Sequence, residues 1–306
     1  MPFVITKAEE GTLLREYLRK TLGLSRAELT VLKQRDEGIL LNGIRVTVRA
    51  VLHEGDILTL ERVDKTSSEA VVPRNLPLSI LYEDEDLIAV NKPPFMPTHP
   101  SHGHYEDTLA NALAFHFAAA GEPFVFRAVN RLDRDTSGIV LVAKNRGAAF
   151  RLSQAIAGGE VEKRYLALAI GKIAHSGTVD ANIRRRTESM IERTVCPPTE
   201  GQSAKTDYRP LTGNESLTLL EVMPITGRTH QIRVHMASLG HPLLGDTLYG
   251  NPSPSPLIAR QALHAVSLTF HRPSDGETIT VTAPLPPDMA AIVQTLPSPN
   301  SMGSQG

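Results

Sequence analysis

The sequence predicts an α+β protein: a small α/β module followed by a larger domain with a mixed, mostly antiparallel sheet. Two observations support this. Strand candidates and helix candidates are mixed along the larger part without an internal repeat, a pattern typical of α+β domains. The strands are expected at 78–82, 86–91, 138–143, 163–170, 217–223 and 262–270, and the helices at 107–118, 146–157 and 229–239. The second observation is a helix–helix–hairpin pattern over 12–62.

Composition excludes several classes of protein. The chain has 306 residues, 41% hydrophobic and 21% charged, which suffices for two domains with a normal core. No apolar run approaches the roughly 18 residues that span a bilayer, and the amino terminus lacks the layout of a secretory signal. The one cysteine, Cys196, excludes an intramolecular disulfide and leaves too few thiols for a zinc ribbon. We therefore expect a cytoplasmic protein without a membrane partner.

The module at 1–62 concentrates positive charge in a chain whose net charge is only −1. Leucines at helical spacing predict a first helix ending at Gly23, a second helix follows, and Asn42-Gly43 is a strong hairpin signal. Six basic residues face two acidic ones between 15 and 35. The basic side chains expected to contact RNA phosphates are Arg15, Arg19, Arg26 and Lys33. Solvated helix faces often have such a composition, so charge alone leaves the question open.

The stretch LSRAELTVLKQRDEGILLNGIRV, followed by VLHEGDILTL, resembles the alpha-L RNA-binding module of the small-subunit ribosomal protein four type. That resemblance implies that the module binds RNA. The alternative is that it is an amino-terminal extension without an RNA-binding role. Residues 63–77 are polar and contain prolines, which predicts a linker to a catalytic domain at 78–293. The low-complexity end of the chain, 294–306, is expected to be a disordered tail.

The densest group of reactive side chains is Asn130-Arg131-Leu132-Asp133-Arg134-Asp135-Thr136-Ser137-Gly138, which precedes an apolar strand. Alternating charges this close can neutralise one another, so one interpretation is a salt-bridged turn. The other is a reactive loop, and RLDRDTSG resembles the RLDxxTSG signature of RluA-type pseudouridine synthases. The resemblance implies that Asp133 is the catalytic carboxylate and Asp135 is structural. Asn130 stands where many members of the family have histidine.

Three further segments resemble the same family in the expected order. They are Asn91-Lys92-Pro93 with His99-Pro100, Lys163-Arg164-Tyr165-Leu166-Ala167, and Gly227-Arg228-Thr229-His230-Gln231-Ile232-Arg233-Val234-His235. The resemblance implies a pseudouridine synthase fold with a central active-site cleft. It assigns the active-site tyrosine to Tyr165 and the arginine paired with the aspartate to Arg233. Lys92, Arg228, His230 and Ile232 are expected to support these residues.

The local patterns agree with these roles. Tyr165, Ala167 and Ala169 share one face of their strand, which leaves space over the tyrosine ring for a stacked base. A core tyrosine with small neighbours is the alternative. On the helix 229–239, the expected buried stripe is Ile232, Met236 and Leu239. Arg233 lies at its edge, where surface and buried positions are equally compatible with the pattern.

The implied reaction breaks the bond between C1′ and N1 of a uridine, rotates the uracil and rejoins it through C5. It is a rearrangement and needs no cofactor or metal, and the sequence has no P-loop, GxGxxG motif or metal-spaced His/Cys cluster. Asp133 can act as a nucleophile or take the C2′ proton, and the sequence does not choose between them. Arg233 is expected to hold that carboxylate bidentately and Tyr165 to stack on the uracil.

The expected partner is a structured RNA, ribosomal or transfer RNA, and the protein is expected to be a monomer. A base inside a helix must be flipped out to reach a pocket, and the resemblance implies that Arg131 helps to fill the vacated position. The alternative is an arginine that only stabilises the turn. Arg184 and Arg185, within a run of three arginines, are expected to hold flanking phosphates.

Two other functions are alternatives to an active pseudouridine synthase. An RNA-binding protein that has lost catalysis predicts damage at Asp133, Tyr165 or Arg233, and all three are intact. A glycosidase using Asp133 and Asp135 requires carboxyl groups on opposite sides of a bond, about 5–9 Å apart, which two positions in one turn provide poorly.

Overall fold

A computed structural model describes residues 2–24, 26–61, 71–187, 189 and 191–297. Its larger part is a nine-stranded sheet whose strands are antiparallel except for one parallel pair, β7 with β14. The order across the sheet is β5 (Ile80–Glu83), β6 (Leu87–Lys92), β7 (Ser137–Ala143), β14 (Leu263–His271), β8 (Glu162–Ile170), β13 (Leu217–Pro224), β12 (Lys205–Gly213) and β9 (Gly177–Asp180), with β15 (Thr278–Thr282) paired to β14. The predicted mixed, mostly antiparallel sheet is confirmed.

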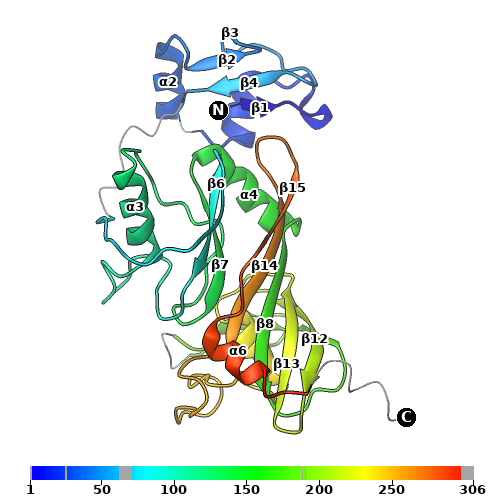
Figure 1. Cartoon of the computed structure of the whole chain (residues 1–306). Coiled ribbons are helices and arrows are strands. Elements are labelled where there is room, and N and C mark those ends of the chain that lie inside the picture. The colour runs from blue at the N-terminus through cyan, green and yellow to red at the C-terminus, as the bar shows by residue number, and fades with distance from the viewer. Residues whose placement is uncertain (1, 25, 62–70, 188, 190, 298–306) are drawn as a thin grey trace.

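Helices cover both faces of the β6–β7 half of this sheet (Figure 1). Every residue of β7 is buried, because Val140 and Val142 pack into one core and Ile139 and Leu141 into the other. Helix α3 (Leu109–Ala119) contributes to the first core, and α4 (Arg146–Gly158) contributes Leu152 to the second. The side chains of Thr108 and Asn145 cap the two helices by accepting backbone N–H groups.

The amino-terminal module has its own four-stranded antiparallel sheet and its own core. The strand order is β1 (Pro2–Val4), β4 (Ile57–Leu60), β2 (Ile39–Leu41) and β3 (Ile44–Arg45). Its helices are α1 (Leu14–Glu16), which continues into a π-helical turn at Tyr17–Thr21, and α2 (Arg26–Gln34). Asn42 and Gly43 both have positive φ, 53° and 77°, as a two-residue hairpin turn of this kind requires. The sequence did not predict β1.

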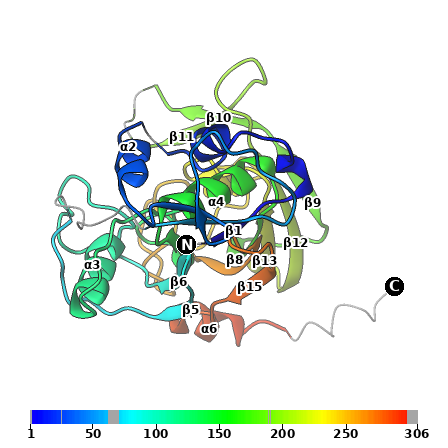
Figure 2. The same cartoon turned by 90° about the horizontal axis from the view of Figure 1, so that it is seen from above.

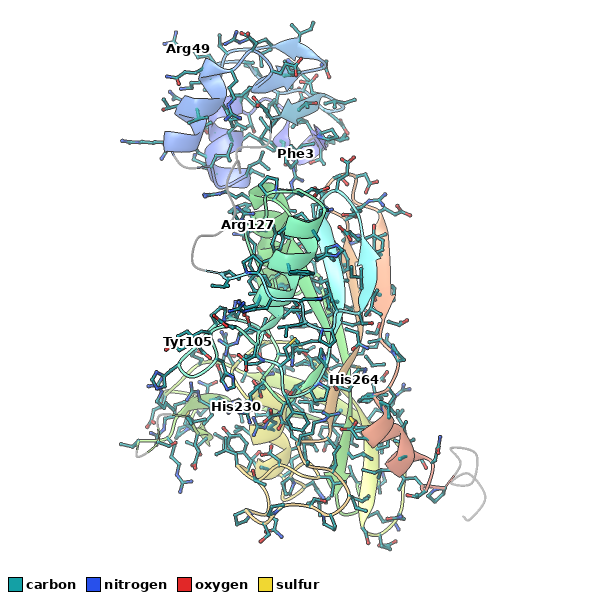
Figure 3. The ribbon with its side chains drawn as sticks, turned by 60° about the vertical axis from the view of Figure 1, so that its left-hand side comes forward. Phe3, Arg49, Tyr105, Arg127, His230 and His264 are labelled. Carbon is teal, nitrogen blue, oxygen red and sulfur yellow. The ribbon has the colours of Figure 1, made fainter. Side chains whose placement is uncertain are left out.

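The module sits on α4 of the catalytic domain, at the end remote from α6 (Figures 1 and 2). Arg151 of α4 makes the central contact: its Nη2 donates to the Tyr17 hydroxyl, and its guanidinium lies 5.3 Å from the centre of the Phe3 ring. Figure 3 shows Phe3 on the side of the module that faces the catalytic domain. Gly147 admits this ring, because a Cβ there would lie 2.8 Å from Phe3. The two parts therefore meet through a packed contact.

In the larger domain the sequence did not predict the strands β9, β12 and β15, the hairpin of β10 (Asn182–Arg185) and β11 (Arg193–Cys196), or the helix α6 (Pro287–Val293). Helix α5 (Gln231–Ser238) lies at its expected place, but Leu239, expected in the buried stripe, is 41% exposed because the helix ends before it. Leu296, within the expected tail, is buried beside α6. Most of the expected linker (63–70) and tail (298–306) lies outside the described residues.

Candidate active site

Asp133, Tyr165 and Arg233 line one cavity of about 270 Å³. They come from three separate elements: the loop before β7, strand β8 and helix α5. His230, which also lines the cavity, belongs to the turn before α5 and is labelled in Figure 3, where it lies away from the amino-terminal module. The long-range contacts of the sheet thus bring together the three residues expected to carry the reaction.

The loop that holds Asp133 is fixed through its backbone. The Asp133 carbonyl accepts from the Thr136 N–H at 3.1 Å, and the Leu132 carbonyl accepts from Thr98 Oγ1 at 3.1 Å. The fully buried Lys92 donates to the carbonyls of Pro93, Met96 and Arg134 at 3.0, 2.7 and 2.9 Å. Lys92 is not among the residues that line the cavity, and its hydrogen bonds support the loop. Burial lowers its pKa to about 7, against the raising influence of Asp135 and Asp133.

Two neighbours of Asp133 serve the turn. Asp135 accepts a forked pair of hydrogen bonds from Arg134, at 2.7 and 3.1 Å, as expected for a salt-bridged turn. Asn130 accepts from the Leu141 N–H at 2.7 Å and donates to the Ile139 carbonyl at 3.1 Å. Its side-chain amide therefore fixes the loop that precedes β7 to the backbone of β7.

Arg233 is buried and holds two carboxylates. Its Nε and Nη2 donate to the two oxygens of Asp246 at 2.7 and 2.9 Å, and its Nη1 donates to Asp133 Oδ2 at 3.1 Å. The expected bidentate contact with Asp133 is therefore wrong: the guanidinium fork grips Asp246, and Asp133 receives one donor. Burial opposes the charge of Arg233, but hydrogen bonds and charges of Asp246 and Asp133 outweigh it and raise its pKa.

Tyr165 pairs with Val222 of β13 and Ala265 of β14, in the middle of the sheet. Ala167 and Ala169 lie in the same core as Tyr165, while Leu168 packs into another, as the alternation predicts. Burial, and then the charge of Asp133, raises the pKa of Tyr165, so its phenol keeps its proton at neutral pH.

The turn from Thr226 to His230 is held by the side chain of Gln231. Gln231 Oε1 accepts from Thr226 Oγ1 and the Arg228 N–H at 2.6 and 2.9 Å, and Nε2 donates to the Lys205 carbonyl at 2.9 Å. His230 has a left-handed backbone, with φ of 59°, a conformation that few residues other than glycine adopt. Burial lowers the pKa of His230. Arg228 and Ile232 also line the cavity.

The arginines expected to contact RNA fall into three places. Arg131 is exposed at the cavity itself. Arg184 and Arg185 of β10 line a second hollow of about 370 Å³ together with Arg193 and Arg228, so this hollow shares a wall with the first. The module residues Arg15, Arg19, Arg26 and Lys33 are all exposed, and Lys33 lines a groove of about 610 Å³ with Arg35, Arg45 and Arg49.

Sequence reasoning missed two residues of the site, Asp246 and Tyr249. No role was predicted for Asp246. The signal available in the sequence was the chemistry of arginine. If Arg233 is buried, its five N–H donors need acceptors, and a carboxylate such as that of Asp246 can supply them. Tyr249 carried no signal of its own. Among the described residues, no group of three or more His, Cys, Asp or Glu side chains could hold a metal, and no helix is long and apolar enough to cross a membrane.

Comparison with known proteins identifies a family. Residues 86–238, which include Asp133, Tyr165 and Arg233, match the family described as RNA pseudouridylate synthase. A Bacillus subtilis (strain 168) protein, the uncharacterized RNA pseudouridine synthase YjbO, is 44% identical, covering 92% of this chain and 98% of its own. Ribosomal large subunit pseudouridine synthase D of Nitrosomonas europaea is 42% identical, covering 72% of this chain and 66% of its own.

Solved structures give the same result for the fold. Human RNA Pseudouridylate Synthase Domain Containing 1 is 31% identical with a TM-score of 0.58, covering 70% of this chain and 87% of its own. Human RNA Pseudouridylate Synthase Domain Containing 4 is 25% identical with a TM-score of 0.60, covering 72% and 95%.

Proposed function

The chain belongs to the RNA pseudouridylate synthase family, and from this premise we propose that it isomerises uridines of ribosomal RNA through the carboxylate of Asp133. It is an RNA pseudouridine synthase and therefore an isomerase. The observation that carries the proposal is the convergence of Asp133, Arg233 and Tyr165 on one cavity.

In this reaction the bond between C1′ and N1 breaks, a bond between C1′ and C5 forms, the C5 proton leaves and N1 gains a proton. Atoms balance within the nucleotide, so no co-reactant is consumed. Asp133 attacks C1′ or removes the C2′ proton, and either role needs an ionised carboxylate. Arg233 Nη1 donates to Asp133 Oδ2 at 3.1 Å and holds the carboxylate in position, while Asp246 keeps the arginine itself in place.

Tyr165 serves as the stacking surface for the detached uracil. Its neighbours on the same face of β8 are alanines, and its ring lies at the cavity wall. The raised pKa keeps the phenol neutral, so it can take up the C5 proton only by passing its own proton on. Arg131, exposed at the cavity, would occupy the position that the flipped nucleotide leaves.

Ribosomal RNA is proposed as the substrate because relatives carry the name ribosomal large subunit pseudouridine synthase D. Such a substrate would place the enzyme in the cytoplasm. The amino-terminal module, in the manner of alpha-L modules, would bind RNA through Arg15, Arg19, Arg26 and Lys33, and Arg184 and Arg185 would hold phosphates beside the cavity. The enzyme would act as a monomer.

The test is Asp133→Asn, a nearly isosteric change that removes the charge. We expect the rate on RNA carrying tritium at uracil C5 to fall by at least about a thousandfold. The thermal unfolding of the variant should stay near that of the wild type. Asp135→Asn is the matched control, since Asp135 is two residues away and pairs with Arg134 outside the cavity. An active Asp133→Asn enzyme would refute the assignment.

The same pair of variants identifies the target. Cells lacking the gene are complemented with the wild type or with Asp133→Asn, and pseudouridine is mapped in all RNA. Sites restored by the wild type alone should lie in ribosomal RNA. Restoration confined to transfer RNA would contradict the proposed substrate while leaving the enzyme class intact.

A further inference from the structure

The hydroxyl of Tyr249 lies between the β10–β11 hairpin and the catalytic cavity. It accepts a hydrogen bond from the Arg193 backbone N–H at 2.8 Å and lies 2.7 Å from His230 Nδ1. These are its two hydrogen-bond partners among the described residues. The ring of Tyr249 contacts the edge of His230, with ring centres 5.6 Å apart, and lies 5.0 Å from the Arg233 guanidinium.

The proton positions in this chain follow from the chemistry of its members. A backbone N–H can only donate, so the Tyr249 oxygen is the acceptor from Arg193. The hydroxyl proton is then available for His230 Nδ1, which is its one remaining partner. A neutral imidazole that accepts at Nδ1 carries its own proton on Nε2.

Both rings are neutral in this environment. Burial raises the pKa of Tyr249 and lowers that of His230. The charged groups that face His230 oppose one another: Asp133 and Asp246 favour the imidazolium, while Arg233 and Arg193 disfavour it.

His230 Nε2 points toward the catalytic carboxylate. It lies 3.8 Å from Asp133 Oδ2, the same oxygen that accepts from Arg233 Nη1 at 3.1 Å. A separation of 3.8 Å is longer than a hydrogen bond, and catalytic contacts of this length commonly close when substrate binds. Both donors thus converge on one oxygen of Asp133, which lines the cavity, and Oδ1 has no hydrogen-bond partner among the described residues.

We propose that Tyr249 and His230 are positioning residues for Asp133: Tyr249 fixes neutral His230 with its proton on Nε2, and His230 together with Arg233 anchors Oδ2, so that Oδ1 is the atom that reacts with the ribose. This rests on the proposed catalytic role of Asp133. Without the tyrosine hydroxyl, the other tautomer would turn the Nε2 lone pair toward the carboxylate, and the anchor would be replaced by repulsion.

The first test measures the tautomer in the free protein, where no RNA or activity is involved. Long-range ¹H–¹⁵N spectra of the histidine rings should show Nδ1 of His230 unprotonated and Nε2 protonated in the wild type, with His230→Gln identifying the signals. Tyr249→Phe should shift His230 toward the Nδ1-protonated form or a mixture. Tyr105→Phe, at an exposed tyrosine, is the control and should leave the spectrum unchanged. Nδ1 protonated in the wild type, or a spectrum unaffected by Tyr249→Phe, overturns the proposal.

The second test links the tautomer to the reaction. Tyr249→Phe should lower the single-turnover rate about tenfold, as expected for one lost hydrogen bond, with RNA affinity within about twofold of the wild type. His230→Gln supplies an amide donor whose proton does not depend on Tyr249. In that background, adding Tyr249→Phe should have little further effect on the rate.

Two results of the second test would count against the proposal. Additive effects of the two substitutions would mean that Tyr249 acts independently of His230. If Tyr249→Phe binds RNA more weakly but reacts at an unchanged rate, Tyr249 only holds the β10–β11 hairpin in position through Arg193. Failure of the proposed function is distinguishable, because it appears as activity in Asp133→Asn whatever the tautomer of His230.

Discussion

Arg233 shows how one buried side chain fixes two others. A guanidinium has five N–H donors, and Asp133, at the wall of a cavity, can satisfy only some of them without leaving its position. The buried Asp246 therefore takes the forked contact. This division keeps Asp133 accessible while its counter-charge stays immobile.

The buried histidine of β14 gives a prediction for stability. His264 on β14 is fully buried, with Nδ1 2.9 Å from Ser137 Oγ. Burial lowers its pKa from 6.5 to about 4. Between these values the unfolded chain binds a proton that the folded protein does not, so stability falls as pH falls from about 6.5 to about 4. The loss should reach roughly 3 kcal/mol.

The check is urea unfolding of wild type and His264→Gln across this range. The difference in unfolding free energy between them should shrink as the pH falls, because only the wild type loses the contribution. Gln154→Ala, at an exposed residue that does not titrate, should keep a constant difference from the wild type. If the difference in unfolding free energy between the wild type and His264→Gln stays constant across this pH range, the prediction is wrong.

At the scale of residues, the sequence identified the members of the site through their motifs. It named Asp133, Tyr165 and Arg233, but it assigned the arginine fork to the wrong carboxylate. It gave Tyr249 no role, because its partners lie 19 and 56 residues away along the chain. Such pairings depend on how the elements fold together.

Among the elements, the parallel contact of β7 with β14 depends on Gly138. Its φ is +112°, and a Cβ would lie 2.3 Å from the Ala265 carbonyl oxygen. Gly138→Ala should therefore destabilise the protein by about 3 kcal/mol or more, since backbone on both strands would have to move. Urea unfolding measures this.

Gly276→Ala separates the cost of the positive φ from the cost of the steric clash with β14. Gly276 also has a positive φ, +78°, but nothing lies within 4 Å of a Cβ there. It should cost about 1 kcal/mol from backbone conformation alone. Equal costs at the two positions would mean that the close approach of β7 and β14 is unimportant.

The elements that the sequence missed have physical reasons. Strand β1 has three residues, too few for a periodic pattern. Strand β12 contains Pro210, which argues against a central strand, but its register shifts just there and β9 pairs only with Lys205–Tyr208. The elements that were found have long apolar runs or clear helical spacing.

For the whole molecule, the contact around Arg151 sets how the module sits. Arg151→Ala would remove a donor to Tyr17 and the contact with the Phe3 ring, a loss of about 2 kcal/mol. We expect the module to unfold separately from the catalytic domain, so that calorimetry resolves two transitions instead of one. Gln154→Ala, at an exposed position of the same helix, should leave a single transition. A single transition in both variants would contradict the prediction.

The seat of the module on α4 has a consequence for which nucleotides are modified. If the module binds RNA as proposed, its groove and the catalytic cavity are two RNA-binding sites at a fixed distance from each other. Two attachment points joined by the packed contact at Arg151 favour RNA folds whose bound segment and flipped uridine are spaced to match. Selection among uridines would then depend on distance as well as on base identity.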